Sequence, residues 1–285
     1  MKVAKTIKSV RALVRTARKA GRRIGFVPTM GALHEGHISL IERSVKNGDF
    51  VVVSIFVNPT QFGAGEDFSR YPRPMRRDLQ ICRDCGADVV FAPDEKEIYS
   101  DKNLTWVNVE KLSEPLCGRF RPGHFQGVAT VCAKLFNIVG PDAAYFGQKD
   151  AQQAAVIKRM VTDLNLALKI VVCPTVRAAD GLALSSRNRY LSPGERKDTT
   201  CIYRSLVIAR EMIKAGVTNP KTITARMRKI INASKSLTSI DYVSVVDAEK
   251  LVDLRRIEGS VLIAVAARFG STRLIDNITV DAEKL

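Results

Sequence analysis

Aromatic side chains and histidine are scarce in this chain of 285 residues, which has one tryptophan, 6% aromatic residues and three histidines. With so few rings the core must be mostly aliphatic, and 46% hydrophobic residues suffice for one large domain or one large and one small. No run of eighteen apolar residues occurs, so we expect no membrane span and no membrane partner. A secretory signal is also absent, and we expect a cytoplasmic protein.

Cysteine pairs with metal-ligand spacing are nearly absent as well. Among six cysteines only Cys82 and Cys85 form a C-x-x-C pair, and no second pair or histidine pair accompanies it. A zinc or redox site is the alternative, but the pair falls late in an expected helix. We interpret these as ordinary helix cysteines of a reducing cytoplasm, and metal ligands stay unknown.

The charge is strongly one-sided, with a net charge of +16 and a pI near 9.8. The excess is spread over Lys2–Arg23, Arg70–Arg77 and Arg204–Lys235, and no zinc finger or aromatic RNA-binding strand motif interleaves with it. We interpret it as a solvated basic surface that helps anionic substrates, with no nucleic-acid partner. The alternative, a nucleic-acid-binding protein, predicts tight and strongly salt-dependent binding.

Apolar runs alternate with amphipathic stretches through the first 190 residues. The basic start could be a transit peptide, but Val3, Ile7, Val10 and Val14 stand at helical spacing and predict a first helix. Further helices are expected at Ile38–Lys46, Met75–Cys85, Gln126–Val139 and Ala151–Leu164, and strands at Ile24–Pro28, Phe50–Val57, Asp88–Ala92, Leu104–Val109, Ala143–Phe146 and Leu168–Cys173. This order predicts an α/β fold with a parallel sheet, helices on both faces and ligands beyond the carboxyl ends of the strands.

The pattern changes after Tyr190, where a smaller α+β domain is expected. Ser192 can cap a helix that has proline in its first turn and Glu195 three residues after the cap. That helix is expected to run to about Ala215, followed by a helix at Pro220–Ala233 and strands at Asp241–Val246, Ser260–Ala267 and Thr272–Thr279. We therefore expect one domain over residues 1–180 and a C-terminal lid domain over residues 181–285.

The strongest chemical signal is the segment PTMGALHEGH, residues 28–37, between the first strand and the first sheet-packed helix. Gly31 and Gly36 allow close approach of the backbone, and N–H groups at the start of a helix can face a phosphate. His34 and His37 can donate hydrogen bonds to phosphate oxygens, and their charge would stabilise a pentacoordinate transition state and a departing pyrophosphate. A metal site is the alternative for this pair, but the chain has only His124 besides them.

The H-x-G-H turn resembles that of the nucleotidyltransferase superfamily, and the longer sequence segments resemble those of the pantothenate synthetase family. The segments that carry the resemblance, in the family's order, are PTMGALHEGH, VNPTQF at 57–62, RPGHF at 121–125, FGQKD at 146–150 with Gln152 and Gln153, and LALSSRN at 182–188. The resemblance implies a Rossmann-like domain and an enzyme that uses ATP to adenylate pantoate and then joins the pantoyl group to β-alanine. It also implies Mg²⁺ and a homodimer.

Site residues follow from the same resemblance. The implied catalytic residues are His34, His37 as proton donor, and Lys149. The implied ATP-binding residues are Met30, Gly31, Ala32, Leu33, His34, Glu35, Gly36, His37, Gly147, Gln148, Lys149, Asp150, Val176, Leu184, Ser185, Ser186 and Arg187. Gln61 and Gln153 are implied to bind pantoate, and an amide, which both donates and accepts, suits a hydroxy acid.

Departures from the family's commonest wording remove none of these residues. Leu184 stands where methionine is usual, and Arg76 and Arg77 stand in a stretch that is often acidic, so that only Asp78 remains there as a carboxylate. The alternative function is another nucleotidyltransferase of the superfamily, with a phosphate ester as acceptor. It would require arginine or lysine where this chain has Gln61 and Gln153.

Overall fold

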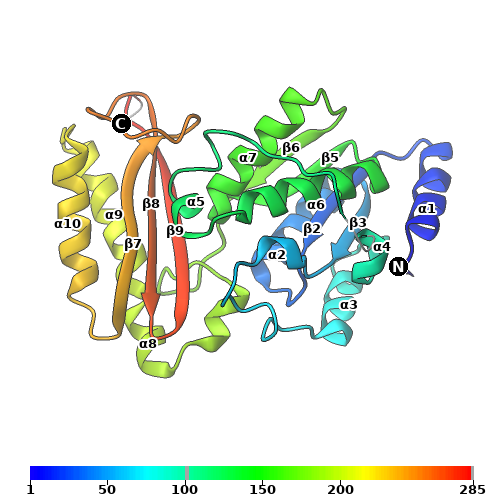
Figure 1. The fold of residues 1–285 in the computed structure, drawn as a ribbon, viewed down its shortest axis with the longest axis horizontal. Helices are drawn as coiled ribbons and strands as arrows, with labels where there is room; N and C mark the ends of the chain where they lie inside the picture. Colours follow the sequence, from blue (N-terminus) through cyan, green and yellow to red (C-terminus); the bar gives the residue numbers. More distant parts are fainter. Residues whose placement is uncertain (100–102, 284–285) are drawn as a thin grey trace. The chain divides into compact units, whose positions relative to one another are not determined.

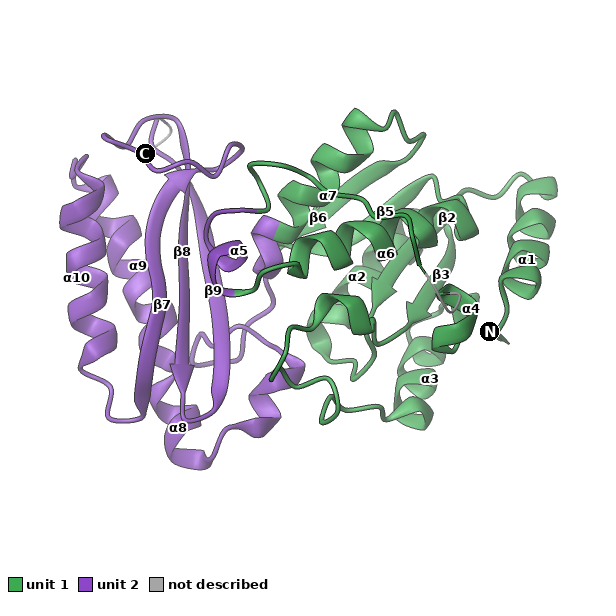
Figure 2. Cartoon of the chain, viewed as in Figure 1, with its two compact units in different colours: residues 1–113, 121–148, 153–174 green, residues 114–120, 149–152, 175–285 purple. Residues whose placement is uncertain are grey.

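The computed structural model describes residues 1–99 and 103–283, which form two compact units (Figure 1, Figure 2). The first unit comprises Met1–Ser113, Arg121–Gln148 and Gln153–Pro174, and the second comprises Glu114–Phe120, Lys149–Gln152 and Thr175–Leu285. The predicted domains, 1–180 and 181–285, differ from these units in their bounds, because residues 114–120, 149–152 and 175–180 of the first predicted domain belong to the second unit.

The first unit is built on a six-stranded sheet in which every pair of neighbouring strands is parallel. Its strands are β1 (Lys2–Ala4), β2 (Ile24–Thr29), β3 (Phe50–Ile55), β4 (Val89–Phe91), β5 (Ala143–Gly147) and β6 (Lys169–Cys173). The strand order is β1-β4-β3-β2-β5-β6, so the chain builds outward from β2 on one side and then continues with β5 on its other side. The expected parallel α/β sheet is confirmed.

Helices cover both faces of this sheet, as its uninterrupted apolar strands require. They are α1 (Ile7–Lys19), α2 (Glu35–Lys46), α3 (Met75–Asp84), α4 (Glu95–Ile98), α6 (His124–Val139) and α7 (Ala151–Asp163). Neighbouring residues of β2 point to opposite faces: Val27 joins the core cluster that includes Leu40 and Ile41 of α2, whereas the ring of Phe26 packs edge-on against Phe136 of α6.

A buried carboxylate ties α2 to the sheet. Asp49, 3% exposed, accepts hydrogen bonds from Ser44 Oγ at 2.9 Å, from the Tyr145 hydroxyl at 2.5 Å and from Arg23 Nε at 3.1 Å. Burial, together with the neighbouring Asp49 carboxylate, raises the pKa of Tyr145, so this hydroxyl keeps the proton that it donates. Gly25 of β2 lies directly beneath the cluster, where a Cβ atom would overlap Ser44 Oγ.

The second unit pairs helices with a three-stranded antiparallel sheet of order β7-β8-β9. Its elements are α5 (Cys117–Phe120), α8 (Pro193–Asp198), α9 (Thr200–Lys214), α10 (Pro220–Asn232), β7 (Leu237–Asp247), β8 (Ser260–Phe269) and β9 (Thr272–Asp281). One core cluster contains Leu206 of α9, Met227 of α10 and Val265 of β8. Ser192 caps α8 in a capping box with Glu195, as predicted.

Three predicted elements are wrong. Val3 belongs to β1, which pairs with β4, so the first helix begins only at Ile7. Residues 104–109 form no strand: the N–H of Val107 donates to Thr130 Oγ1, and Leu104 is 87% exposed. The helix expected from Ser192 to Ala215 is two helices, α8 and α9, separated at Thr199.

The cysteines behave as ordinary core residues. Burial raises the pKa of the Cys82 and Cys132 thiols to about 12 and that of Cys201 to about 11, which disfavours the thiolate that metal binding or redox chemistry needs. No group of three or more candidate metal-binding side chains occurs in the described part of the chain. Across residues 1–99 and 103–283, no helix combines the length and apolar character needed to cross a bilayer.

Substituting Gly25 tests the packing around Asp49. We expect Gly25→Ala to lower the free energy of unfolding by about 1–3 kcal/mol, because the new methyl group displaces Ser44 or Asp49. Gly194→Ala is the matched control, since its Cβ meets no atom within 4 Å. Urea unfolding followed by circular dichroism measures both variants, and equal midpoints would contradict the prediction.

Candidate functional site

The order of the strands marks one edge of the first sheet as the place for a ligand. The chain proceeds from β2 to β3 on one side and places β5 on the other, so the carboxyl ends of β2 and β5 flank a topological switch point. β2 ends at Thr29 and runs into the H-x-G-H turn, and β5 ends at Gly147, followed by Gln148. The predicted residues 30–37, 147 and 148 therefore emerge from this edge of the first unit.

Both histidines of the turn hold the start of α2 through their Nδ1 atoms. His34 is the N-cap residue, with Nδ1 accepting the Gly36 N–H at 3.1 Å, and His37 Nδ1 accepts the His34 N–H at 3.3 Å. A neutral imidazole whose Nδ1 accepts carries its proton on Nε2. The ring centroids are 4.2 Å apart, so the turn presents two Nε2–H donors from neighbouring rings.

The glycines of the turn are required by its internal packing. A Cβ at Gly36 would lie 2.8 Å from Cε1 of His34, so a larger residue there would displace the capping ring. Gly31 has φ +76° and Ala32 φ +52°, a left-handed conformation that costs a residue with a side chain about 1–2 kcal/mol. A strong stabilising contact must offset that cost.

That contact is Asp78 of α3. Its carboxylate, 1% exposed, accepts the N–H of Ala32 at 2.8 Å and the N–H of Leu33 at 2.9 Å. The N–H of Gly31 donates to Thr29 Oγ1 at 3.1 Å. The N–H groups of Gly31, Ala32 and Leu33 thus have acceptors within the protein, and so does the Gly36 N–H at the start of α2, where the sequence suggested donors to a phosphate.

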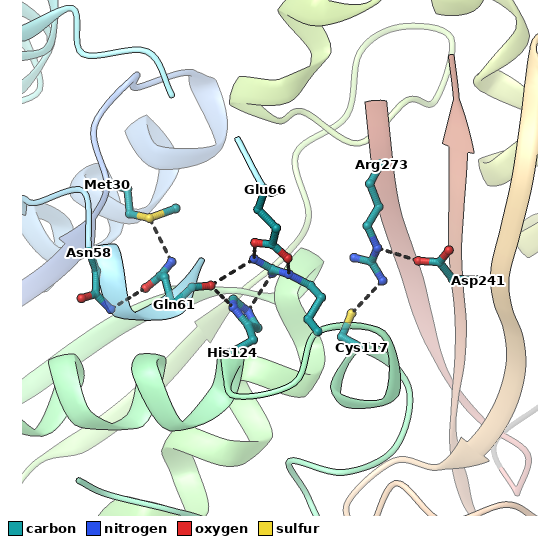
Figure 3. Close-up of polar contacts among 9 residues, drawn as sticks. Met30, Asn58, Gln61, Glu66, Cys117, His124, Asp241 and Arg273 are labelled. Carbon is teal, nitrogen blue, oxygen red and sulfur yellow. Dashed lines mark hydrogen bonds and ion pairs between the residues drawn. The ribbon is translucent and has the colours of Figure 1, made fainter. Parts of the chain in front are cut away.

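A chain of hydrogen bonds sets the orientation of the Gln61 amide (Figure 3). Gln61 ends the short helix η1 (Pro59–Gln61) after β3, and its Oε1 accepts Asn58 Nδ2 at 3.1 Å. Asn58 is fixed in turn, because its Oδ1 accepts the Tyr99 hydroxyl at 2.8 Å and Thr60 Oγ1 at 3.0 Å. The Gln61 Nε2 group therefore points to Met30 Sδ, 2.9 Å away, and brings two predicted site residues together.

Three residues hold the Gln61 backbone from the other side. The carbonyl of Gln61 accepts His124 Nδ1 at 2.8 Å and Arg121 Nη2 at 3.2 Å. Since arginine can only donate, the contact of Arg121 Nη1 with His124 Nε2 at 2.9 Å makes Nε2 an acceptor, and the His124 proton lies on Nδ1. Glu66 binds Arg121 through both oxygens, at 2.7 and 2.6 Å (Figure 3).

Gln153, the other glutamine predicted to bind substrate, has a simpler setting. Gln153 lies half-buried on α7 of the first unit. Its neighbour Gln152 belongs to the second unit, where its side chain accepts the Cys117 N–H at 3.0 Å and donates to the Pro115 carbonyl at 2.7 Å. Of the two adjacent glutamines, Gln152 thus has a structural role and Gln153 is the candidate for a ligand.

The second unit contains the other predicted ATP-binding residues. Val176 and Leu184 are joined directly, since the Leu184 N–H donates to the Val176 carbonyl at 3.0 Å across a two-stranded turn. Ser185 caps the short helix η3 (Ser186–Tyr190), where its Oγ accepts the Arg187 N–H at 3.3 Å. The Lys149 ammonium lies 3.6 Å from the Asp150 carboxylate.

Two buried residues of β9 hold these segments, and neither was predicted from the sequence. Asp276 accepts Arg177 Nη1 at 2.6 Å and Nη2 at 2.9 Å, and the guanidinium of Arg177 lies 4.0 Å above the ring of Tyr203. Burial raises the pKa of Asp276 and outweighs the opposing effect of Arg177. Asn277 Nδ2 donates to the Lys149 carbonyl at 2.8 Å. The signal in the sequence was the pair of adjacent polar residues, Asp276 and Asn277, within a predicted strand.

Known proteins resemble the whole chain in sequence. A family model described as pantoate-beta-alanine ligase matches residues 2–279. The pantothenate synthetase of Acetivibrio thermocellus is 56% identical over 281 residues, which cover 99% of this chain and 100% of the relative. That of Moorella thermoacetica is 53% identical, with 99% of each chain covered.

Solved structures agree with this result. The crystal structure of pantothenate synthetase from Thermus thermophilus matches with a TM-score of 0.93 and 44% identity, covering 98% of this chain and 99% of its own. A pantoate-beta-alanine ligase from Francisella tularensis, crystallised with β,γ-ATP and β-alanine, matches with a TM-score of 0.79 and 36% identity, covering 99% and 98% of the two chains.

The Glu66–Arg121 ion pair makes a pH-dependent contribution to stability. Burial acts to raise the pKa of Glu66, but the hydrogen bond and charge of Arg121 outweigh it, so the pKa lies below its ordinary value of 4.5. A lowered carboxyl pKa stabilises the folded state above pH 4.5, and this stability is lost as the pH falls through the folded-state pKa. We expect Glu66→Gln to unfold more easily than the wild type at about pH 7.

The difference between the two proteins should shrink below pH 4.5 and vanish once Glu66 is protonated in both states. Urea unfolding between about pH 3 and pH 7 measures the difference. Glu42→Gln, at an exposed position on α2, is the control. A difference that stays constant or grows toward low pH would contradict the assignment.

Proposed function

This chain belongs to the pantoate–β-alanine ligase family, and on that premise we propose that it condenses pantoate with β-alanine at the expense of ATP, giving pantothenate, AMP and pyrophosphate. The family match spans residues 2–279, so it includes every predicted site residue. The observation that carries the proposal within the structure is the pair of imidazoles, each held through Nδ1 at the start of α2, at the switch point of the sheet.

The first half-reaction is adenylation of pantoate. A carboxylate oxygen of pantoate attacks the α-phosphorus of ATP, the bond from that phosphorus to the bridging oxygen breaks, and pyrophosphate leaves. His34 and His37 donate hydrogen bonds to the phosphate oxygens as negative charge moves onto them, with His37 as proton donor. Donors that are already fixed before the ligand arrives need no reorganisation in the transition state.

The second unit supplies cationic and hydroxyl donors in this proposal. Lys149 meets a phosphate and Asp150 the ribose, while Val176 and Leu184 contact the nucleotide. Ser185, Ser186 and Arg187 donate to the phosphates, and the planar guanidinium of Arg187 suits two oxygens at once. The side chain of Asn277 restrains the Lys149 backbone. The backbone hydrogen bond between Val176 and Leu184 holds these two residues next to each other.

The second half-reaction forms the amide. The amine of β-alanine attacks the acyl carbon of pantoyl adenylate, the acyl–oxygen bond to AMP breaks, and the amine proton passes to solvent. Gln61 and Gln153 bind pantoate oxygens, and Gln61 faces the substrate with its NH₂ group because Asn58 occupies its Oε1. The protein contributes positioning and electrostatic stabilisation, with no covalent intermediate on a side chain.

Magnesium is expected to arrive with the nucleotide. The described residues hold no group of three or more metal-binding side chains, and Mg²⁺ commonly binds through substrate phosphates while keeping several waters. We therefore propose that MgATP is the co-substrate. The family resemblance further suggests a homodimer, which sedimentation equilibrium tests. It also suggests a location in the cytoplasm, where ATP is present.

The alternative acceptor, a phosphate ester, fits the surroundings of Gln61 poorly. The atoms that contact the Gln61 amide are the Asn58 amide and the Met30 sulfur, which are neutral, and the nearby Arg121 is already paired with Glu66. A phosphate acceptor would need uncompensated cationic donors there. A hydroxy acid with an uncharged carbon chain is the better match.

Omitting each substrate in turn tests the proposed function. Pyrophosphate release should require ATP and pantoate but not β-alanine, and AMP release at a steady rate should require all three. Phosphopantetheine in place of pantoate should give no pyrophosphate. Pyrophosphate release with phosphopantetheine and none with pantoate would replace the proposal by the alternative.

Replacing His34 with asparagine separates capping from catalysis. The amide oxygen of the introduced asparagine can accept the Gly36 N–H as Nδ1 does, because asparagine is a favourable N-cap residue, but it has no equivalent of Nε2–H. We expect His34→Asn to keep the thermal midpoint and to lose about 10²–10³ in kcat for pyrophosphate release. Glu42→Gln on the same helix serves as control, and a fully active His34→Asn enzyme would refute the role of Nε2.

Lys149 offers a second test, because its backbone and side chain have separate partners. Asn277 holds the Lys149 carbonyl, so Lys149→Ala should leave the local backbone in place. We expect kcat for pyrophosphate release to fall by at least about 10²-fold, as for loss of one charge-assisted contact in a transition state. Lys158→Ala, an exposed lysine of α7, is the matched control. Equal rates for the two variants would exclude Lys149 from phosphate binding.

A further inference from the structure

The buried carboxylate of Asp78 is bound directly to the backbone of the H-x-G-H turn. Asp78 lies on α3, more than forty residues along the chain from the turn, and its two oxygens accept the N–H groups of Ala32 and Leu33. Both hydrogen bonds are short, at 2.8 and 2.9 Å, and buried. Hydrogen bonds to an ionised acceptor are roughly twice as strong as neutral ones.

The conformation of the turn explains why a carboxylate is needed there. Gly31 and Ala32 are both left-handed, at φ +76° and +52°, and the N–H groups of Ala32 and Leu33 point to one acceptor group. Successive N–H groups in such a turn form a concave site for an anion. In this chain the anion is a side chain, which occupies the site permanently and fixes the two peptides immediately before His34.

The fit between turn and carboxylate leaves little room for change. A Cβ at Gly31 would lie 2.9 Å from Asp78 Oδ2 and 3.0 Å from Cγ2 of Ile55. Asp78 is 1% exposed, so no solvent can replace the carboxylate without rearrangement. The position of His34 is therefore coupled to α3 through a rigid contact.

We propose that Asp78 is a positioning residue for adenylation: by holding the Ala32 and Leu33 N–H groups, it sets the place of the His34 and His37 imidazoles. This inference rests on the proposed function, in which those rings donate to the phosphates of ATP. Asp78 itself contacts no substrate. It acts only in the half-reaction that uses the histidines, and the amide-forming half-reaction proceeds without it.

Two assays on the full-length protein separate the half-reactions. Pyrophosphate exchange into ATP in the presence of pantoate reports adenylation, and AMP release from supplied pantoyl adenylate and β-alanine reports amide formation. In Asp78→Asn one N–H keeps an oxygen acceptor and the other faces an NH₂ group. We expect adenylation to fall by about 10²-fold, as for a small displacement of a catalytic group, and amide formation to stay at the wild-type rate.

Asp84→Asn is the matched control, because Asp84 is an exposed carboxylate on the same helix that accepts a hydrogen bond from the nearby Gln80. It should leave both half-reactions unchanged. A double-mutant cycle with His34→Asn tests whether Asp78 acts through the histidines: the part of the Asp78→Asn loss that passes through His34 should be absent in the double variant, so the combined loss should be smaller than the product of the two single losses.

Hydrogen exchange in the wild type tests the contact without any substitution. The Ala32 and Leu33 amides should exchange only through larger opening events, because both are buried and bonded to the carboxylate. This measurement decides the matter if Asp78→Asn fails to fold. Fast exchange at both amides would overturn the proposal.

Three other results would also overturn it: wild-type adenylation in Asp78→Asn, an equal loss in both half-reactions, or fully multiplicative effects in the cycle. Failure of the proposed function itself looks different. In that case the wild-type protein would show no pantoate-dependent exchange of pyrophosphate, whereas failure of this inference leaves wild-type exchange intact.

Discussion

The structure of the first unit depends on how the turn after β2 satisfies its backbone N–H groups. The chain leaves the sheet in a left-handed turn, and a helix must begin within a few residues, so several donors need acceptors at once. Thr29, Asp78, His34 and His37 supply those acceptors from four different places along the chain. The same hydrogen bonds therefore begin the helix α2 and fix the positions of the two histidine rings.

The histidines show how local partners decide chemical character. In His34 and His37 the backbone occupies Nδ1, so Nε2 carries the proton. In His124 the order is reversed, since Arg121 donates to Nε2 and the Gln61 carbonyl accepts from Nδ1. The three histidines thus differ in which ring nitrogen carries the proton. Their hydrogen-bond partners decide this, and the spacing of the residues in the sequence does not show it.

Local patterns predicted most helices and strands, because periodicity and capping act over a few residues: Ser192 and Glu195, for example, form the expected capping box. Two of the three wrong predictions concern strand pairing, which depends on residues far along the chain. Val3 pairs with β4, nearly ninety residues away in sequence, and Leu104–Val109 found no strand to join. The motif positions were visible from resemblance, but Asp78, Asn277 and the Asn58–Tyr99 contact were not, because each acts on a backbone or side chain far along the chain.

The edge position of β1 has a consequence for the order in which the protein assembles during synthesis. Residues 2–4 are synthesised before their partners, residues 89–91, so β1 can join the sheet only after β2, β3 and β4 have been made. Closing so long a loop carries an entropy cost that grows only slowly with its length. The nascent sheet can thus grow around β2 first and acquire its N-terminal edge strand late, as a closing step of the first half-sheet.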